Sequence, residues 1–136
     1  MSTNTPIKQN PVIKIDIETI KKLKESFLED GQTVVHCNYV AKRKYINGGW
    51  VNIYPTTYLV NNNTKLQMLH AENIPVAPKS YVFKNAGELK QFTLFFPVIP
   101  KDWDEFSMVE QCDLDDGFVV KNIKRNNTGV YELAIS

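Results

Sequence analysis

The fold class of this chain is decided by the stretch Gln91-Phe92-Thr93-Leu94-Phe95-Phe96, which is followed by Pro97-Val98-Ile99-Pro100. Polar and apolar side chains alternate at its start, and its end is continuously apolar. The alternation predicts a β-strand, and the apolar end indicates that this part is buried on both sides. Pro97 and Pro100 are expected to close the strand, because proline cannot donate to a strand ladder.

The same strand pattern recurs along the chain. Further strands are predicted at residues 12–17, 33–41, 50–54, 58–60, 66–69, 81–83, 118–123 and 130–135. Turn sequences rich in Asn predict hairpin tips at residues 61–64 and 125–129. Residues 19–30 have apolar spacings that suit a few helical turns, although a hairpin with charged flanks would also serve.

Composition agrees with the strand pattern. The chain has 11 Ile and 13 Val but only 5 Ala and 9 Leu, and β-branched residues prefer strands whereas Ala and Leu prefer helices. Many short strands with frequent turns and no long helical pattern predict an all-β fold, either an antiparallel sandwich or a barrel.

Length and charge indicate the number of domains and the classes of partner. With 136 residues the chain suits one domain, predicted at residues 12–136 after a flexible lead-in at 1–11. The net charge of +1 gives no global field for nucleic acid. No apolar run approaches the roughly 20 residues of a membrane span, so no membrane insertion is expected. The polar start lacks a signal peptide, which taken alone suggests a cytoplasmic location.

A string of short motifs lies between residues 33 and 124. In chain order they are Thr33-Val34-Val35, Gly49-Trp50-Val51-Asn52-Ile53, Thr57-Tyr58-Leu59, residues 66–69 leading into Ala71-Glu72-Asn73-Ile74-Pro75, residues 92–100, and residues 106–110 ahead of Phe118. Their order and spacing resemble a family of bacterial immunoglobulin-like β-sandwich domains without an assigned activity.

The resemblance implies an antiparallel immunoglobulin-like sandwich of about seven to nine strands with at most one short helix. Members of that family are accessory modules of extracytoplasmic proteins, sometimes beside thioredoxin-like domains, so it also implies a binding or structural role. It brings no site residues. This chain differs from the family pattern in the charged segment 18–30 and in the missing export signal, so its location stays open.

Acidic side chains gather between residues 102 and 116, with no Lys or Arg among them. They are Asp102, Asp104, Glu105, Glu110, Asp113, Asp115 and Asp116. Carboxylates on turns usually face water, so a solvated acidic loop is the simpler interpretation. The alternative is a site for a basic partner surface, or for one calcium ion held by Asp113, Asp115 and Asp116, although no EF-hand loop is present.

Aromatic side chains offer a possible sugar platform. The candidates are Trp50, Tyr54, Tyr58 and Trp103. Trp50 begins a predicted central strand and is expected to fill the core. Trp103 lies between Asp102 and Asp104 and next to Glu105, so these four residues are the predicted binding surface.

Catalytic motifs are not found in the sequence, and neither an enzyme nor a cofactor is predicted. His36 and the adjacent Cys37 point to opposite faces of one strand, which disfavours a dyad. Cys37 and Cys112 are either two reduced buried thiols or a disulfide. The basic run 42–44 is either a solvated hairpin end or a weak nucleic-acid contact.

These observations predict a non-catalytic module that binds another protein within a larger bacterial assembly, through its sheet edges or turn loops. A homo-oligomer is compatible with the sequence. The alternative is a module that binds carbohydrate or a calcium-linked ligand.

Overall fold

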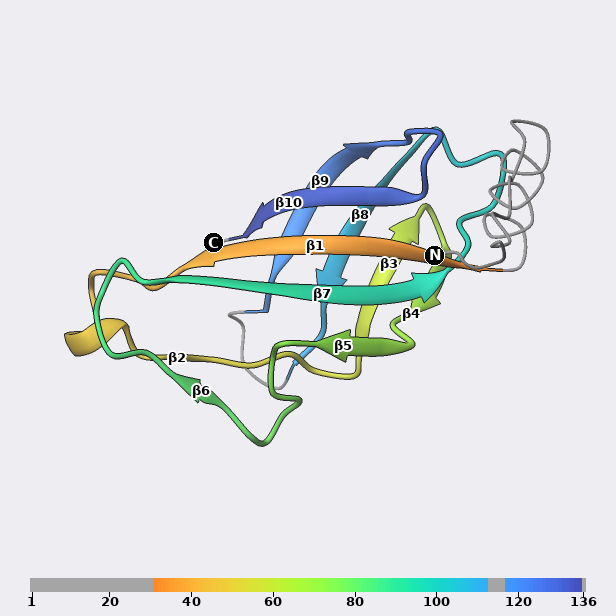
Figure 1. The fold of residues 1–136 in the computed structure, drawn as a ribbon. Coiled ribbons are helices and arrows are strands. Elements are labelled where there is room, and N and C mark those ends of the chain that lie inside the picture. The colour runs from red at the N-terminus through yellow and green to blue at the C-terminus, as the bar shows by residue number, and fades with distance from the viewer. Residues whose placement is uncertain (1–30, 113–116, 136) are drawn as a thin grey trace, which may run out of the picture.

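The computed structural model describes residues 31–112 and 117–135 of the chain (Figure 1). The lead-in at 1–11, the predicted strand at 12–17, the segment 19–30 and the calcium candidates Asp113, Asp115 and Asp116 lie outside the described residues. Within the described residues the chain consists of strands with a single 3-10 turn, η1 (Ile46–Gly48), and no α-helix. The all-β prediction is confirmed there. None of the described residues belongs to a helix long and apolar enough to cross a membrane.

The strands form two four-stranded sheets and one two-stranded sheet. Sheet I has the order β10 (Val130–Ile135), β1 (Gln32–Val40), β7 (Leu89–Pro97), β5 (His70–Glu72). Sheet II has the order β4 (Thr64–Gln67), β3 (Thr57–Asn61), β8 (Glu105–Glu110), β9 (Val119–Lys124). The small sheet pairs β2 (Trp50–Val51) with β6 (Tyr81–Val82).

The core lies between sheets I and II, whose inner faces meet in a sandwich-like arrangement (Figure 1). From sheet I it receives Val35, Cys37, Tyr39, Phe92, Leu94 and Phe96, and from sheet II Leu59, Phe106, Met108 and Ile123. Every second residue is buried throughout β1 and from Phe92 onward in β7, which is the period-two pattern of a strand with one face in water. Burying one large apolar side chain stabilises the fold by about 1.5–3 kcal/mol.

The strand predicted at residues 91–96 is confirmed as the greater part of β7. Phe92, Leu94 and Phe96 point inward. Phe95 points outward and is half-buried, with the His70 ring 5.6 Å from its own. The hairpin predicted around residues 61–64 is also confirmed, since β3 and β4 pair with Asn61 opposite Thr64.

The hairpin predicted around residues 125–129 is wrong. β9 pairs with β8 in sheet II, whereas β10 pairs with β1 in sheet I, so the connection crosses between the sheets. The turn itself exists, because the Asn126 Oδ1 accepts hydrogen bonds from the backbone N–H of Thr128 and Gly129. Arg125 donates to the carbonyls of Pro100 and Trp103, which holds the turn against the 100–104 segment. Turn chemistry marked the reversal correctly but does not decide whether the flanking strands pair.

The prediction of a fully antiparallel arrangement is likewise wrong, because two pairings are parallel: the isolated bridge between Ile53 and Val76, and the pairing of β10 with β1. β10 runs parallel to β1, with Val34 opposite Val130 and Tyr39 opposite Ile135. Parallel neighbours need a long connection, and here nearly the whole domain separates the two strands in sequence. The first and the last of the described strands therefore lie side by side in sheet I.

Candidate binding site

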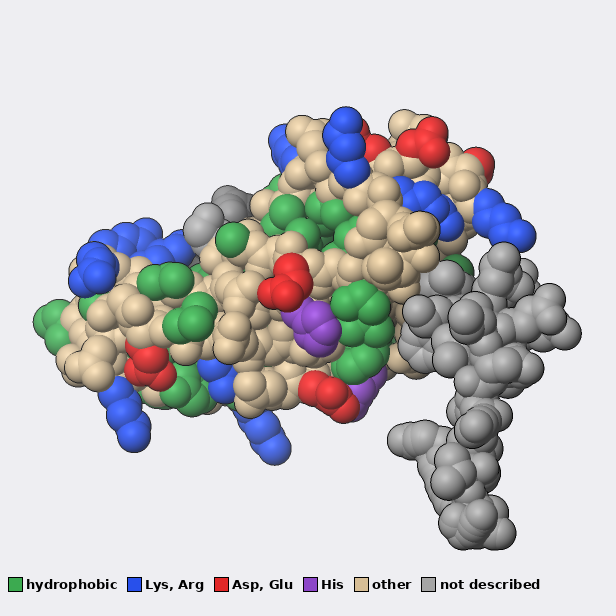
Figure 2. Space-filling model, turned by 45° about the horizontal axis from the view of Figure 1, so that its top comes forward, with side chains coloured by type: hydrophobic (Ala, Val, Ile, Leu, Met, Phe, Trp, Pro, Cys, Tyr) green, Lys and Arg blue, Asp and Glu red, His purple; other side chains and the backbone are tan. Residues whose placement is uncertain are grey.

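One end of the molecule carries exposed apolar side chains in place of the usual polar surface. We call Tyr45, Ile46, Trp50 and Val82 the apolar tip. Ile46 is 92 % exposed, Val82 70 % and Trp50 54 %. Trp50 and Val82 are direct partners in the β2–β6 ladder, so their side chains share one face. Figure 2 shows hydrophobic side chains at the end that carries η1, beside Lys and Arg side chains.

The tip rests on a tightly packed turn. Asn47, Gly48 and Gly49 all have positive φ, at 61°, 87° and 74°. A Cβ on Gly48 would lie 2.7 Å from the Ala41 Cβ and 2.9 Å from the Asn85 carbonyl oxygen. Only glycine allows this approach, so the turn packs closely against Ala41 and Asn85. Ile46, at the start of the turn, is exposed to solvent.

The expectation that Trp50 fills the core is wrong. β2 belongs to the small sheet rather than to sheet I or II, so the Trp50 side of its ladder faces outward while Val51 faces the core. Sequence reasoning also missed Ile46 and Val82. The signal for Ile46 was its place next to Asn47-Gly48-Gly49, because an apolar residue beside a turn has no strand face to bury it.

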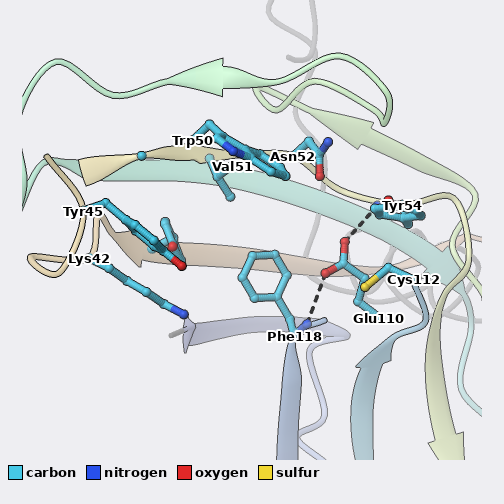
Figure 3. A pocket seen from close by; sticks show the side chains of 11 residues that line it. Lys42, Tyr45, Trp50, Val51, Asn52, Tyr54, Glu110, Cys112 and Phe118 are labelled. Carbon is cyan, nitrogen blue, oxygen red and sulfur yellow. Dashed lines mark hydrogen bonds between the residues drawn. The ribbon is translucent and has the colours of Figure 1, made fainter. Parts of the chain in front are cut away.

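A cavity of about 210 Å³ opens beside the tip (Figure 3). Its walls include the side chains of Lys42, Tyr45, Trp50, Asn52 and Phe118. Aromatic rings, a carboxamide and an ammonium group thus border one hollow, a mixture that suits the capture of a ligand side chain or a small polar molecule.

Glu110, which also lines this cavity, has a structural role (Figure 3). It is only 8 % exposed, and its carboxylate accepts hydrogen bonds from the backbone N–H of Tyr54 at 2.9 Å and of Phe118 at 3.1 Å. Charge-assisted bonds to backbone donors are strong, and they tie the end of β8 to the segments before β3 and β9. The sequence pattern predicts that Glu110 belongs to a solvated acidic loop; the structure shows instead that it is buried and connects two backbone segments.

The two cysteines form no disulfide. Cys37 lies in the core, where burial raises the pKa of its thiol to about 12. At neutral pH this thiol is protonated and is a poor nucleophile. Cys112 lines the cavity next to Glu110.

The predicted binding surface around Trp103 is only partly at the surface. Asp102 and Asp104 are exposed and Glu105 is half-buried, but Trp103 itself is 4 % exposed. Its ring lies 6.4 Å from that of Phe106, and its backbone N–H donates to the Pro100 carbonyl. The turn after Pro100 places the Trp103 indole in the core, while its neighbours Asp102 and Asp104 face solvent. The Trp103 ring is therefore not accessible for contact with a ligand at the surface.

The histidines and a second hollow lie apart from this cavity. His36 and His70 both lie on the outer face of sheet I, where His36 Nδ1 is 2.9 Å from the Thr93 hydroxyl and His70 Nε2 is 3.5 Å from the Glu72 carboxylate. A wider hollow of about 520 Å³ lies between residues 98–101 and 125–129, at the other end of β1. Across 31–112 and 117–135, no three His, Cys, Asp or Glu side chains cluster closely enough to hold a metal ion.

Fold and site together define a small all-β, sandwich-like domain with an exposed aromatic end. Comparison with protein-family models, with curated proteins and with solved structures finds no match to this chain.

Proposed function

We propose that this chain is a non-catalytic module that binds another protein through the apolar tip. The observation that carries the proposal is the paired exposure of Trp50 and Val82 next to the almost fully exposed Ile46. Exposed apolar side chains gathered at one place mark binding surfaces, and Trp is among the residues that dominate binding energy.

Backbone hydrogen bonds hold the apolar tip in one conformation in the unbound protein. The Gly48 N–H donates to the Tyr45 carbonyl at 3.0 Å, and the Phe83 N–H donates to the Gly49 carbonyl at 2.9 Å. On the facing segment, the Ala41 N–H donates to the Glu88 carbonyl, and the Gly87 N–H donates to the Ala41 carbonyl. Because a rigid surface loses little conformational entropy on binding, this support favours affinity.

Charge next to the tip specifies the partner further. Lys42, Arg43 and Lys44 directly precede Tyr45, and the Lys44 ammonium lies 5.1 Å from the Tyr45 ring centre. A matching partner presents an apolar pocket for Ile46 and Trp50 with carboxylates at its rim. Such charge complementarity mainly raises the association rate and the specificity.

The non-catalytic part of the proposal is supported by the state of the reactive groups. Cys37 is buried with a raised pKa, and Glu110 is committed to two backbone N–H groups. The two histidines lie on the outer face of a sheet, away from the cavity. None of these groups is placed to activate a nucleophile.

We also propose an immunoglobulin-like topology and, with it, membership of the bacterial accessory-domain family that the motifs resemble. The order β4-β3-β8-β9 corresponds to strands C′, C, F and G of an immunoglobulin domain, and β1-β7-β5 corresponds to B, E and D. β10 lies beside β1, where strand A lies beside strand B, but it differs from strand A in coming last among the described strands and in running parallel to its neighbour.

Carbohydrate binding is the second candidate, and it now rests on other residues. Trp50 is exposed beside a cavity that Asn52 and Tyr45 also line, so a flat ring lies next to polar groups that can bond sugar hydroxyls.

The test begins with crosslinking of the full chain in its native cells and identification of the attached protein, followed by titration of the two purified proteins. Trp50→Ala is expected to weaken binding at least about 30-fold, the effect of losing a hot spot of roughly 2 kcal/mol. Reversal of charge at Lys42 and Arg43 is expected to slow association.

Val119→Ser, on the exposed face of β9, is the matched control and is expected to leave binding unchanged. Equal affinities of the Trp50→Ala variant and the wild type would refute the protein-docking surface. Binding of an oligosaccharide on a glycan array, lost in Trp50→Ala, would establish the second candidate in its place.

A further inference from the structure

The edges of the two large sheets differ in how well they are protected. β5 has three residues, β4 carries Lys65, and β9 carries Lys121, Lys124 and a positive φ at Asn122. Short length, lysine and backbone irregularity are the means by which proteins prevent unwanted pairing at sheet edges. β10 has six residues, Val-Tyr-Glu-Leu-Ala-Ile, with Glu132 as its single charge.

The backbone groups on the open side of β10 follow from its pairing with β1. The Val34 N–H donates to the Gly129 carbonyl, and Val34 is opposite Val130. In a parallel ladder both groups of alternate residues point to the same neighbour, so Tyr131 and Leu133 bond to β1. Glu132 and Ala134 therefore direct their N–H and C=O groups away from the sheet.

The outward groups near the start of β10 are already used. The Val130 carbonyl accepts from the Asn126 amide at 2.8 Å, and the Val130 N–H donates to the Thr128 hydroxyl at 3.1 Å. Within residues 31–112 and 117–135, no backbone hydrogen bond outside the regular ladders reaches Glu132 or Ala134. The open part of the edge is thus centred on Leu133.

We propose that β10 pairs antiparallel with β10 of a second copy of this chain, across a two-fold axis at Leu133. In that register Glu132 of each copy lies opposite Ala134 of the other, and their N–H and C=O groups satisfy one another. The two Leu133 side chains, each half-buried in one copy, meet on the inner side of the joined sheet. The register also avoids placing the two Glu132 carboxylates opposite each other, which would be repulsive.

The features that favour a second copy all meet at one two-fold axis. At Leu133 this axis pairs the open groups of Glu132 with those of Ala134, brings the two half-buried Leu133 side chains together and keeps the Glu132 carboxylates apart. An isologous interface requires a patch that is complementary to itself, and a strand whose open groups are centred on one residue meets this condition. Sheet I of the two copies becomes one continuous sheet. This inference concerns the edge opposite to β5 and does not depend on the apolar tip.

The experiment is sedimentation of the full chain over a concentration series, with variants that read the register. The wild type is expected to pass from monomer to dimer as concentration rises. Ala134→Glu, which places a carboxylate opposite the partner's Glu132, is expected to weaken association at least tenfold. Glu132→Lys combined with Ala134→Glu restores opposite charges and is expected to restore association.

Gln67→Glu on the edge strand β4 is the matched control and is expected to leave association unchanged. Melting temperatures equal to that of the wild type, compared at a concentration where all of them are monomeric, show that the variants are folded. Three results would each overturn the proposal: a monomer at every concentration, a dimer insensitive to Ala134→Glu, or a failure of the double variant to restore association. Slow amide exchange at Glu132 and Ala134 in a monomer would also overturn it, because the edge would then be covered by the chain itself.

Discussion

At the scale of single residues, Tyr81 and Glu88 connect the small sheet to the turn before β7. The Tyr81 hydroxyl donates to the Glu88 carboxylate at 2.6 Å, and the Lys84 N–H donates to the other carboxylate oxygen at 3.0 Å. The hydrogen bond from Tyr81, followed by that from the Lys84 backbone, lowers the pKa of Glu88. The bond to Glu88 raises the pKa of Tyr81, with smaller effects of burial and of the carboxylate charge.

Replacement Tyr81→Phe is predicted to raise the pKa of Glu88 towards its ordinary value, because the largest cause of the shift is removed. The folded-state pKa of Glu88 lies below its unfolded value, so its contribution to stability is present above the unfolded pKa. That contribution is lost as the pH falls through the folded pKa. Titration of the Glu88 carboxyl carbon by NMR measures the shift. Tyr58→Phe is the control, and an unmoved Glu88 pKa in Tyr81→Phe would contradict the assignment.

At the scale of elements, the turn around η1 positions the apolar tip. Its geometry depends on the close approach of Gly48 to Ala41, Asn85 and Ala86 and on three consecutive residues with positive φ. A side chain at Gly48 would collide with the Ala41 Cβ and the Asn85 carbonyl and would move the whole turn.

Gly48→Ala is predicted to destabilise the domain by about 1–3 kcal/mol, the cost of backbone strain combined with a steric clash. It is also expected to reduce partner binding, because Ile46 and Trp50 are displaced together. Asn47→Gly is the control and should change stability little, since glycine accepts the φ of 61° readily. Urea unfolding measures both variants, and equal midpoints for Gly48→Ala and wild type would refute the tight packing.

At the scale of the whole molecule, β10 links the two sheets. Tyr131 belongs to sheet I, yet its ring meets the ring of Phe106 from sheet II edge to face, at 5.2 Å between centres. Its hydroxyl accepts a hydrogen bond from the Asn126 N–H at 3.1 Å. Tyr131 of the last described strand therefore packs between the two sheets and also bonds to the turn that connects them.

Tyr131→Ala is predicted to cost about 3–5 kcal/mol of unfolding free energy, as for other large aromatic side chains removed from a core. Tyr131→Phe keeps the ring contact and loses the hydrogen bond, so a cost of about 0.5–1.5 kcal/mol is expected. Chemical denaturation separates the two. Equal losses for both variants would show that the hydroxyl, and not the ring, carries the contribution of Tyr131.

Local patterns predicted most strands of the described residues but not their partners, and they did not predict β5 and β8. Alternation placed β1, β7 and β10, and the Asn-rich turn between β3 and β4 was recognised as a hairpin. The same turn chemistry at residues 125–129 predicts a hairpin that does not form, because β9 and β10 pair with strands of different sheets. The candidate site was missed for a similar reason, since Trp50 and Trp103 exchanged the expected surface and core positions.

Taken alone, the sequence determined the fold class and the positions of most strands, because side-chain alternation and turn residues act over a few neighbours. The pairing of the strands, the parallel direction of β10 beside β1, and the exposure of Trp50, Ile46 and Val82 became evident only in the folded domain. These features depend on which distant segment covers a strand face. Trp103 is buried by Phe106 and the Pro100 turn, and no segment in the described residues covers Trp50 in the same way.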